Sequence, residues 1–120
     1  MLKNVRFETA NNILIASLTG ELDHHNASQL RMEIDAATRA FRTKHLVLDY
    51  TQVEFMDSSG IGLAMGRYRS IKERKGIMVI VPGSSYVSRL LGLSGIFALI
   101  PKCQSRYMAV SFINEKGGKE

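Results

Sequence analysis

Residues 45–81, HLVLDYTQVEFMDSSGIGLAMGRYRSIKERKGIMVIV, contain two short apolar runs on either side of a longer amphipathic stretch. The runs at 45–50 and 77–81 are dense in Val, Ile and Leu, which is typical of buried parallel strands. Between them, apolar positions recur at three- and four-residue steps, and this spacing predicts a helix with one buried face. That face consists of Ile61, Ala64, Met65, Tyr68 and Ile71. A strand, a helix and a second strand in this order predict a parallel pair joined by a helical crossover.

The ends of this central helix are marked by polar residues and a glycine. Asp57 or Ser58 can cap its start with a side-chain oxygen. At its other end, Lys75 supplies a cation and Gly76 is placed to serve as the C′ glycine. We therefore expect the helix to start at the exit of one strand and to stop just before the next.

Further strands are predicted on both sides of this unit. Residues 5–8 alternate apolar and polar side chains, residues 10–12 offer a turn, and residues 13–18 are almost wholly apolar. This pattern predicts an antiparallel hairpin whose first strand lies at an edge of the sheet. Residues 97–100 are expected to form a short edge strand, which Pro101 terminates.

Three more helices are expected outside the central one. Apolar positions follow helical spacing from about His24 to Phe41, and Asp23 is placed to cap that helix. A short helix is expected after Ser84 or Ser85, and a last one over residues 105–114. The side chains of the last helix expected to point inward are Met108, Phe112 and Val110.

The element order defines the fold class and the domain organisation. Helices that alternate with strands predict an α/β protein with a mostly parallel, four- to five-stranded sheet, an N-terminal antiparallel hairpin and about four helices. The length of 120 residues corresponds to one domain, which we place at residues 1–114. Residues 115–120, EKGGKE, are expected to be a frayed tail.

Composition excludes several classes of protein. A single cysteine, Cys103, rules out an intrachain disulfide and any multi-cysteine metal site, and it fits a reducing compartment. The apolar runs are far shorter than the roughly 18 residues that a membrane span needs. The first twelve residues lack the pattern of a secretion signal. We therefore expect a cytoplasmic protein that does not enter a membrane.

The charge balance raises the question of nucleic acid. The chain has 16 Lys and Arg against 11 Asp and Glu, a net charge of +5. Only residues 67–75 are densely basic, and helical spacing would spread those cations over a solvent-exposed helix side rather than into a stripe that reads a groove. No aromatic motif for stacking bases is interleaved with them. We expect no direct nucleic-acid partner.

The chemistry of this sequence is concentrated in residues 55–66, FMDSSGIGLAMG, where two serines stand at the mouth of a helix. Ligands and modifications of parallel sheets tend to occur at the carboxyl ends of strands. A helix N-terminus favours an anion, so a phosphate on Ser58 would be tolerated there. Asp57, together with Glu21 and Asp23 if their loop folds alongside, would repel the same phosphate. Opposed effects of this kind suit a switch.

Other interpretations of the same residues remain open. Asp-Ser-Ser-Gly is also a common composition for a plain helix cap. A serine hydrolase would use Ser58 or Ser59 with His24 or His25 as base and Asp23 as orienter, but no GxSxG motif is present. Consecutive histidines face different ways on a helix, so we expect no metal site. Neither glycine-rich nucleotide fingerprint is present, and no motif demands a cofactor.

The string GELDHHNA at 20–27, followed by FMDSSGIG at 55–62 and GRYRSIK at 66–72, resembles the anti-sigma factor antagonists of the STAS domain family. Within that family it is similar to the sporulation antagonists of spore-forming bacilli. The resemblance extends over nearly the whole chain, and it is the pairing of the first two motifs that makes it specific.

The resemblance implies a regulatory binding module without catalysis of its own. Such an antagonist, when unmodified, binds an anti-sigma factor that is also a serine kinase and so frees a sporulation sigma factor. The kinase then phosphorylates the antagonist on the first serine of the motif, here Ser58, and a serine phosphatase reverses the step. By the same resemblance, Asp57, Ser59 and Gly60 shape the contact loop, and Asp23 lies on the adjoining contact surface.

Two points stay open at the level of the sequence. A STAS module of another stress-signalling pathway would use the same serine chemistry, and Ser59 could replace Ser58 as the acceptor. The net charge of +5 is more basic than expected of such an antagonist, and the excess lies largely in residues 67–75 and near the termini.

Overall fold

A computed structural model describes residues 4–118 and contains one four-stranded sheet in the order β1-β2-β3-β4. The strands are β1 (Val5–Ala10), β2 (Ile13–Leu22), β3 (His45–Met56) and β4 (Met78–Val81). β1 pairs with β2 in antiparallel fashion, and the β2–β3 and β3–β4 pairs are parallel. The hairpin turns at Asn11, which adopts a left-handed φ of 57° that asparagine tolerates. The predicted α/β class, hairpin and mostly parallel sheet are confirmed.

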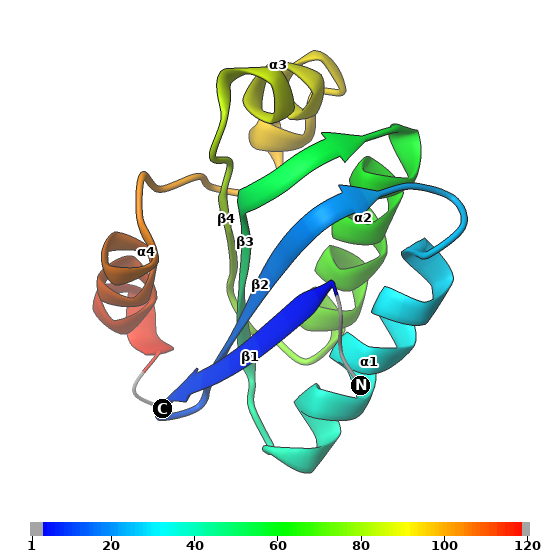
Figure 1. Cartoon of the computed structure of the whole chain (residues 1–120). Coiled ribbons are helices and arrows are strands. Elements are labelled where there is room, and N and C mark those ends of the chain that lie inside the picture. Colours follow the sequence, from blue (N-terminus) through cyan, green and yellow to red (C-terminus); the bar gives the residue numbers. More distant parts are fainter. Residues whose placement is uncertain (1–3, 119–120) are drawn as a thin grey trace.

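Helices cover the sheet on both faces (Figure 1). α1 (Ala27–Ala40) and α2 (Ser58–Glu73) lie side by side on one face, and α4 (Arg106–Ile113) lies on the other. α3 (Ser85–Leu93) follows β4 and stands above the end of the sheet at which β3 leaves. None of the helices within residues 4–118 is long and apolar enough to cross a membrane.

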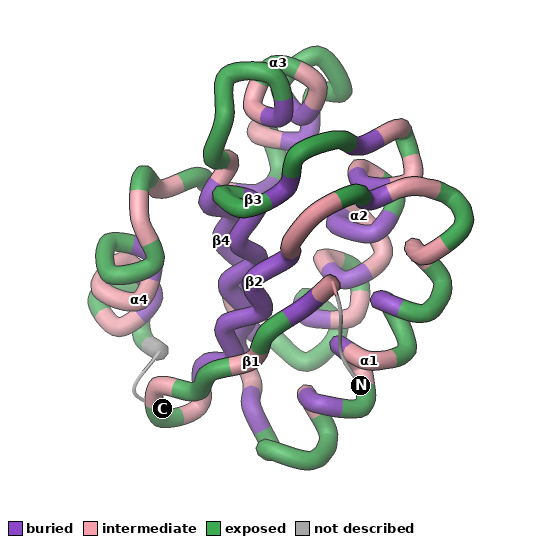
Figure 2. Tube along the Cα trace, in the orientation of Figure 1, coloured by how far each residue is buried: buried purple, intermediate pink, exposed green. Residues whose placement is uncertain are grey.

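The core has two parts, one on each side of the sheet. The larger part joins α1, α2 and α3 to side chains such as Leu14, Leu48 and Ile80. The smaller part joins Ala109 and Ile113 of α4 to alternate residues of the same strands, including Ile15 and Val47. Figure 2 shows the resulting buried band along the central strands. β2 and β3 are therefore buried on both faces, as their continuous apolar runs predict.

The prediction of an edge strand at residues 97–100 is wrong. Gly95 adopts a left-handed φ of 82°, and a short 3₁₀ helix (Ile96–Ala98) follows it. The N–H of Ile100 donates to the carbonyl of Ile96 over 2.9 Å, which closes this turn, and both side chains are buried. The edge of β4 is met instead by one isolated bridge between Ile80 and Lys102.

Two further expectations need correction. Met108 is 48 % exposed, and the buried side chains of α4 are Ala109 and Ile113, with Phe112 partly buried beside them. Lys75, not Gly76, adopts the left-handed conformation after α2. Gly76 is required for a different reason, because a Cβ there would collide with the backbone oxygen of Lys44.

The basic side chains of residues 67–75 were expected to lie on a solvent-exposed helix side, but one of them is buried. Arg67 is buried between α1 and α2, and its Nε lies 3.0 Å from Oδ1 of Asp35 on α1. Burial lowers the pKa of Arg67, and the charge of Asp35 opposes that shift. At the C-terminus, a wider helical turn follows α4 and is broken at Gly117, whose φ is 108°. Lys119 and Glu120 of the expected tail lie outside the described residues.

Candidate functional site

The two motifs meet because β2 and β3 run parallel and end together. The pairing register places Glu21 opposite Phe55 and Leu22 opposite Met56. The chain leaves both strands at the same end of the sheet. There the N–H of Asp57 donates to the carbonyl of Leu22 over 3.2 Å. The loop that carries Asp23 therefore adjoins the loop that carries Ser58.

Asp57 organises the start of α2. Its Oδ1 accepts a hydrogen bond of 2.8 Å from the N–H of Ser59, so Asp57 is the N-cap. Its Oδ2 accepts a longer one, 3.4 Å, from the N–H of His24. The bond from Ser59 is the main cause that lowers the pKa of Asp57. Asp57 is thus an ionised cap that also ties the two loops together.

Ser58 is the first residue of α2 and is exposed, whereas Ser59 is half-buried and Gly60 is buried. The amides that follow Ser58 are already engaged: that of Ser59 by the Asp57 side chain, and that of Gly60 by the Asp57 carbonyl over 3.0 Å. A phosphate on Ser58 would have to compete with Asp57 for these donors. The hydroxyl is accessible to an enzyme, but its phosphorylated form would stand against a fixed negative charge.

Gly60 fixes the distance between α2 and the sheet. A Cβ at this position would lie 2.7 Å from Sδ of Met56 and 3.1 Å from Cδ2 of Leu22. The carbonyl of Gly60 accepts a buried hydrogen bond of 2.8 Å from the hydroxyl of Tyr50. Sequence reasoning assigned Tyr50 only to a strand, because nothing local indicates that its hydroxyl reaches the first turn of α2.

Asp23 holds a turn and does not cap α1, contrary to expectation. Its Oδ1 accepts from the N–H of His25 over 2.9 Å, and its carbonyl accepts from Asn26 and Ala27. α1 begins at Ala27 with Asn26 as its N-cap. Asn26 accepts from the N–H of Asp23 and donates to the carbonyl of Glu21, over 3.0 and 2.7 Å. Sequence reasoning missed Asn26, because its side chain bonds back to the backbone of Asp23 and Glu21 and no local motif indicates this.

The histidines are not arranged as the hydrolase interpretation needs. Nδ1 of His24 lies 3.7 Å from Oδ2 of Asp57, and Nδ1 of His25 lies 3.7 Å from Oδ1 of Asp23. Within residues 4–118, no hydrogen bond joins either ring to Ser58 or Ser59, and no three His, Cys, Asp or Glu side chains gather as metal ligands would. The loop geometry therefore offers surface and charge rather than a nucleophile with its base.

An aromatic pair borders the site and was also missed. Phe55, at the end of β3, stacks on Tyr86 of α3 with ring centroids 6.4 Å apart. The hydroxyl of Tyr86 donates to the carbonyl of Met56 over 3.1 Å. Both rings are nearly half exposed. The pair joins residues 31 positions apart in sequence, so only the fold brings it to the site.

This chain belongs to the STAS domain family, whose model matches residues 4–109. It is 39% identical to the anti-sigma F factor antagonist of Paenibacillus polymyxa over 97 residues, which is 81% of this chain and 83% of that protein. It is 28% identical to an anti-sigma-B factor antagonist of Listeria monocytogenes over 69% of this chain and 72% of that protein.

Solved structures agree with the assignment of the fold. The Bacillus cell fate determinant SpoIIAA in its phosphorylated form aligns with a TM-score of 0.70 and 25% identity, over 91% of this chain and 98% of that one. An anti-sigma factor antagonist homologue from Thermotoga maritima aligns with a TM-score of 0.84 at 18% identity, over 92% and 94% of the two chains.

Proposed function

We propose that this protein is an anti-sigma factor antagonist controlled by phosphorylation of Ser58. In its unphosphorylated form it binds an anti-sigma factor that is also a serine kinase, and so frees a sporulation sigma factor in the cytoplasm. Phosphorylation of Ser58 by that kinase releases the antagonist, and a serine phosphatase restores it. The contact surface includes Asp23, Asp57, Ser59 and Gly60.

The observation that carries this proposal is the placement of Ser58. Its hydroxyl is exposed at the start of α2, between a capped helix and the Asp23 loop, where a protein kinase can reach it. The name of the Paenibacillus relative supports antagonism of an anti-sigma factor. The existence of a phosphorylated form of SpoIIAA supports a phosphoserine switch in this fold.

The surroundings of Ser58 also give a physical reason for release. A phosphoserine adds a charge of about −1.5 to −2 at neutral pH. The amides of Ser59 and Gly60 are held by Asp57, so a phosphate would have to compete with Asp57 for these two donors. In a kinase complex the nucleotide phosphates must also face Ser58 for transfer. After transfer, an interface that formed around a neutral hydroxyl would hold a phosphate beside the carboxylate of Asp57, which is costly.

Two serine variants test this proposal against its closest competitor. Ser58→Ala should bind the anti-sigma kinase as the parent does but should stay bound when ATP is added. Ser59→Ala should bind, take up phosphate and dissociate. Binding is measured by calorimetry, and release by a sizing column with and without ATP. Release of Ser58→Ala by ATP, with phosphate on Ser59, would move the switch to the second serine.

A module of a general stress pathway is the second candidate, and the anti-sigma-B factor antagonists among its relatives favour it. The same serine chemistry would then act on a different anti-sigma factor. Binding of this chain to a sporulation-type and to a sigma-B-type anti-sigma kinase, compared side by side, distinguishes the two. A preference of at least tenfold for the sigma-B-type partner would decide for the second candidate.

A further inference from the structure

Phe55 and Tyr86 form an exposed stacked pair, and we call these two residues the aromatic patch. Their side chains are 47% and 44% exposed, and the stacked rings are inclined by 22°. The hydrogen bond from Tyr86 to the carbonyl of Met56 fixes the position of its ring. Large aromatic side chains that are ordered before binding lose little entropy in a complex, and such residues dominate binding energies at protein interfaces.

The patch is continuous with the proposed switch. Phe55 precedes Ser58 by three residues, and the carbonyl that accepts from Tyr86 belongs to Met56, next to Asp57. A partner large enough to cover the Ser58 loop would therefore reach both rings. Both rings are nearly half exposed, so both are accessible to such a partner.

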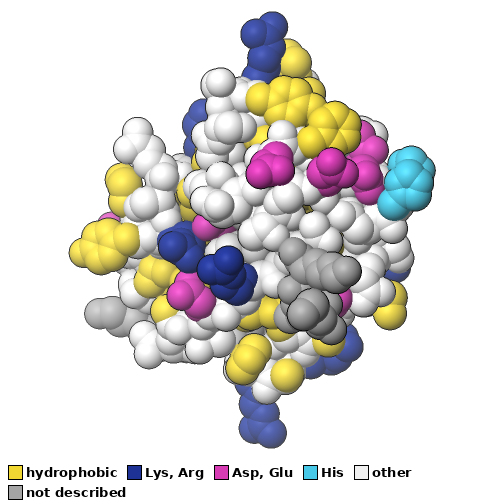
Figure 3. Space-filling model, viewed as in Figure 1, with side chains coloured by type: hydrophobic (Ala, Val, Ile, Leu, Met, Phe, Trp, Pro, Cys, Tyr) yellow, Lys and Arg dark blue, Asp and Glu magenta, His cyan; other side chains and the backbone are white. Residues whose placement is uncertain are grey.

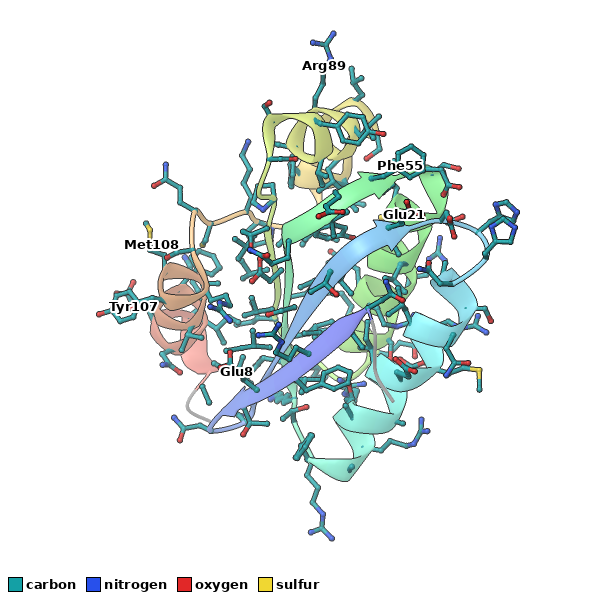
Figure 4. All side chains as sticks on the ribbon, viewed as in Figure 1. Glu8, Glu21, Phe55, Arg89, Tyr107 and Met108 are labelled. Atoms are coloured by element: carbon teal, nitrogen blue, oxygen red, sulfur yellow. The ribbon has the colours of Figure 1, made fainter. Side chains whose placement is uncertain are left out.

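Acidic side chains flank the patch. Glu21 is paired with Phe55 across the β2–β3 ladder and is exposed, and the two lie together at this end of the sheet in Figure 4. Glu54, also exposed, directly precedes Phe55, and Asp23 follows two residues after Glu21. Figure 3 shows hydrophobic side chains bordered by acidic ones over this part of the surface. An apolar centre with a charged rim is the usual anatomy of a specific interface.

We infer that the aromatic patch is an anchoring contact for the anti-sigma partner, and that the partner supplies an apolar side chain for the rings and Lys or Arg for the acidic flank. This inference rests on the proposed function. Affinity for the partner and release of the partner then depend on different parts of one surface. The patch holds the partner in a way that phosphate does not alter, and Ser58 supplies the part that phosphate disrupts.

The test uses the full chain and a purified sporulation anti-sigma kinase. Phe55→Ala should weaken binding at least tenfold by calorimetry. In phosphorylation assays it should raise the KM for this chain at least tenfold and leave kcat within twofold, because Ser58 and its surroundings are unchanged. Tyr86→Phe keeps the ring and removes only the bond to Met56, so it should have a smaller effect than Tyr86→Ala.

Tyr107→Ala is the matched control, because Tyr107 is an aromatic side chain on α4 that is 81% exposed and lies well away from Phe55 in Figure 4. It should bind as the parent does. Glu21→Lys should slow association several-fold, by an amount that shrinks as salt is added. Thermal unfolding of each variant establishes that it is folded.

The outcomes separate this inference from the proposed function. If the parent binds and is released through Ser58, but Phe55→Ala and Tyr86→Ala bind as tightly as Tyr107→Ala, the patch is not an anchor and the proposed function stands. If Glu21→Lys associates faster, the partner's rim is not basic and that part of the inference is wrong. If the parent itself neither binds nor accepts phosphate, both proposals fall.

Discussion

Asp57 fixes the geometry around Ser58, because its two carboxylate oxygens hold α2 and the Asp23 loop at once. The bonds that Asp57 accepts stabilise its ionised form and lower its pKa. The lowered pKa means that the folded state binds a proton on Asp57 less readily than the unfolded chain does. Its contribution to stability is therefore present above the ordinary carboxyl pKa of 3.8 and is lost as the pH falls through the lower, folded value.

This linkage predicts how Asp57 variants respond to pH. Asp57→Ala should lower the Tm at pH 7, because the cap is lost, and the difference from the parent should shrink toward pH 2. Asp57→Asn keeps a capping oxygen without a charge, so its Tm at pH 7 should fall less than that of Asp57→Ala. Thermal unfolding by circular dichroism at both pH values measures the effect. A difference between parent and Asp57→Ala that stays constant with pH would contradict this role of the ionised carboxylate.

Sequence reasoning predicted a cap at Asp57 or Ser58 and the meeting of the two loops, because these follow from a local motif and from the rule that parallel strands end together. It could not find Tyr86 or Tyr50. Each reaches the site from a distant part of the chain, and the residues next to each tyrosine do not indicate where its hydroxyl binds. Asp23 was identified as a loop residue, but its partner Asn26 takes the position of cap that was expected of Asp23.

At the scale of elements, α2 is set against the sheet by Gly60, and two glycines of the same helix provide a matched test. Gly60→Ala should destabilise the fold by about 1–3 kcal/mol, because the added Cβ must displace Met56 or Leu22. Gly62→Ala adds the same group where nothing lies within 4 Å, and it should stabilise the helix by about 0.5–1 kcal/mol. Urea unfolding measures both, and equal effects of the two variants would contradict this packing of α2.

Periodicity predicted correctly the elements with long, regular hydrophobic patterns. In the central helix and the buried strands, many positions match the helix or strand period, so one deviating residue does not change the prediction. Residues 97–100 are too few for that, and their apolar side chains fit a strand or a buried turn equally well. The left-handed Gly95 and the hydrogen bond from the N–H of Ile100 to the carbonyl of Ile96 decide for the turn.

At the scale of the whole molecule, Arg106 ties α4 to the sheet. Its Nη1 lies 3.1 Å from Oε1 of Glu8 on β1, and its Nε lies 3.5 Å from Oδ2 of Asp49 on β3. Asp49 is only 3% exposed, whereas Glu8 is 58% exposed. The two ion pairs therefore differ in value, since an exposed pair contributes little and a buried carboxylate that loses its partner is costly.

This difference predicts that Arg106→Ala destabilises the protein by about 1–3 kcal/mol, while Glu8→Ala costs less than about 1 kcal/mol. The remaining bonds to Asp49, from Ser17 and the N–H of Thr51, limit the larger loss. Urea unfolding of the two single variants is the measurement. A larger effect of Glu8→Ala would show that the exposed pair, and not Asp49, anchors α4.

The proposed switch requires that phosphate on Ser58 abolishes binding to the anti-sigma kinase. The decisive measurement is to form the complex of this chain with a sporulation anti-sigma kinase, add ATP, and follow the complex on a sizing column while peptide mass spectrometry locates the phosphate. We predict one phosphate, on Ser58, and loss of the complex in step with its appearance. A chain that carries phosphate on Ser58 and remains bound would contradict the account.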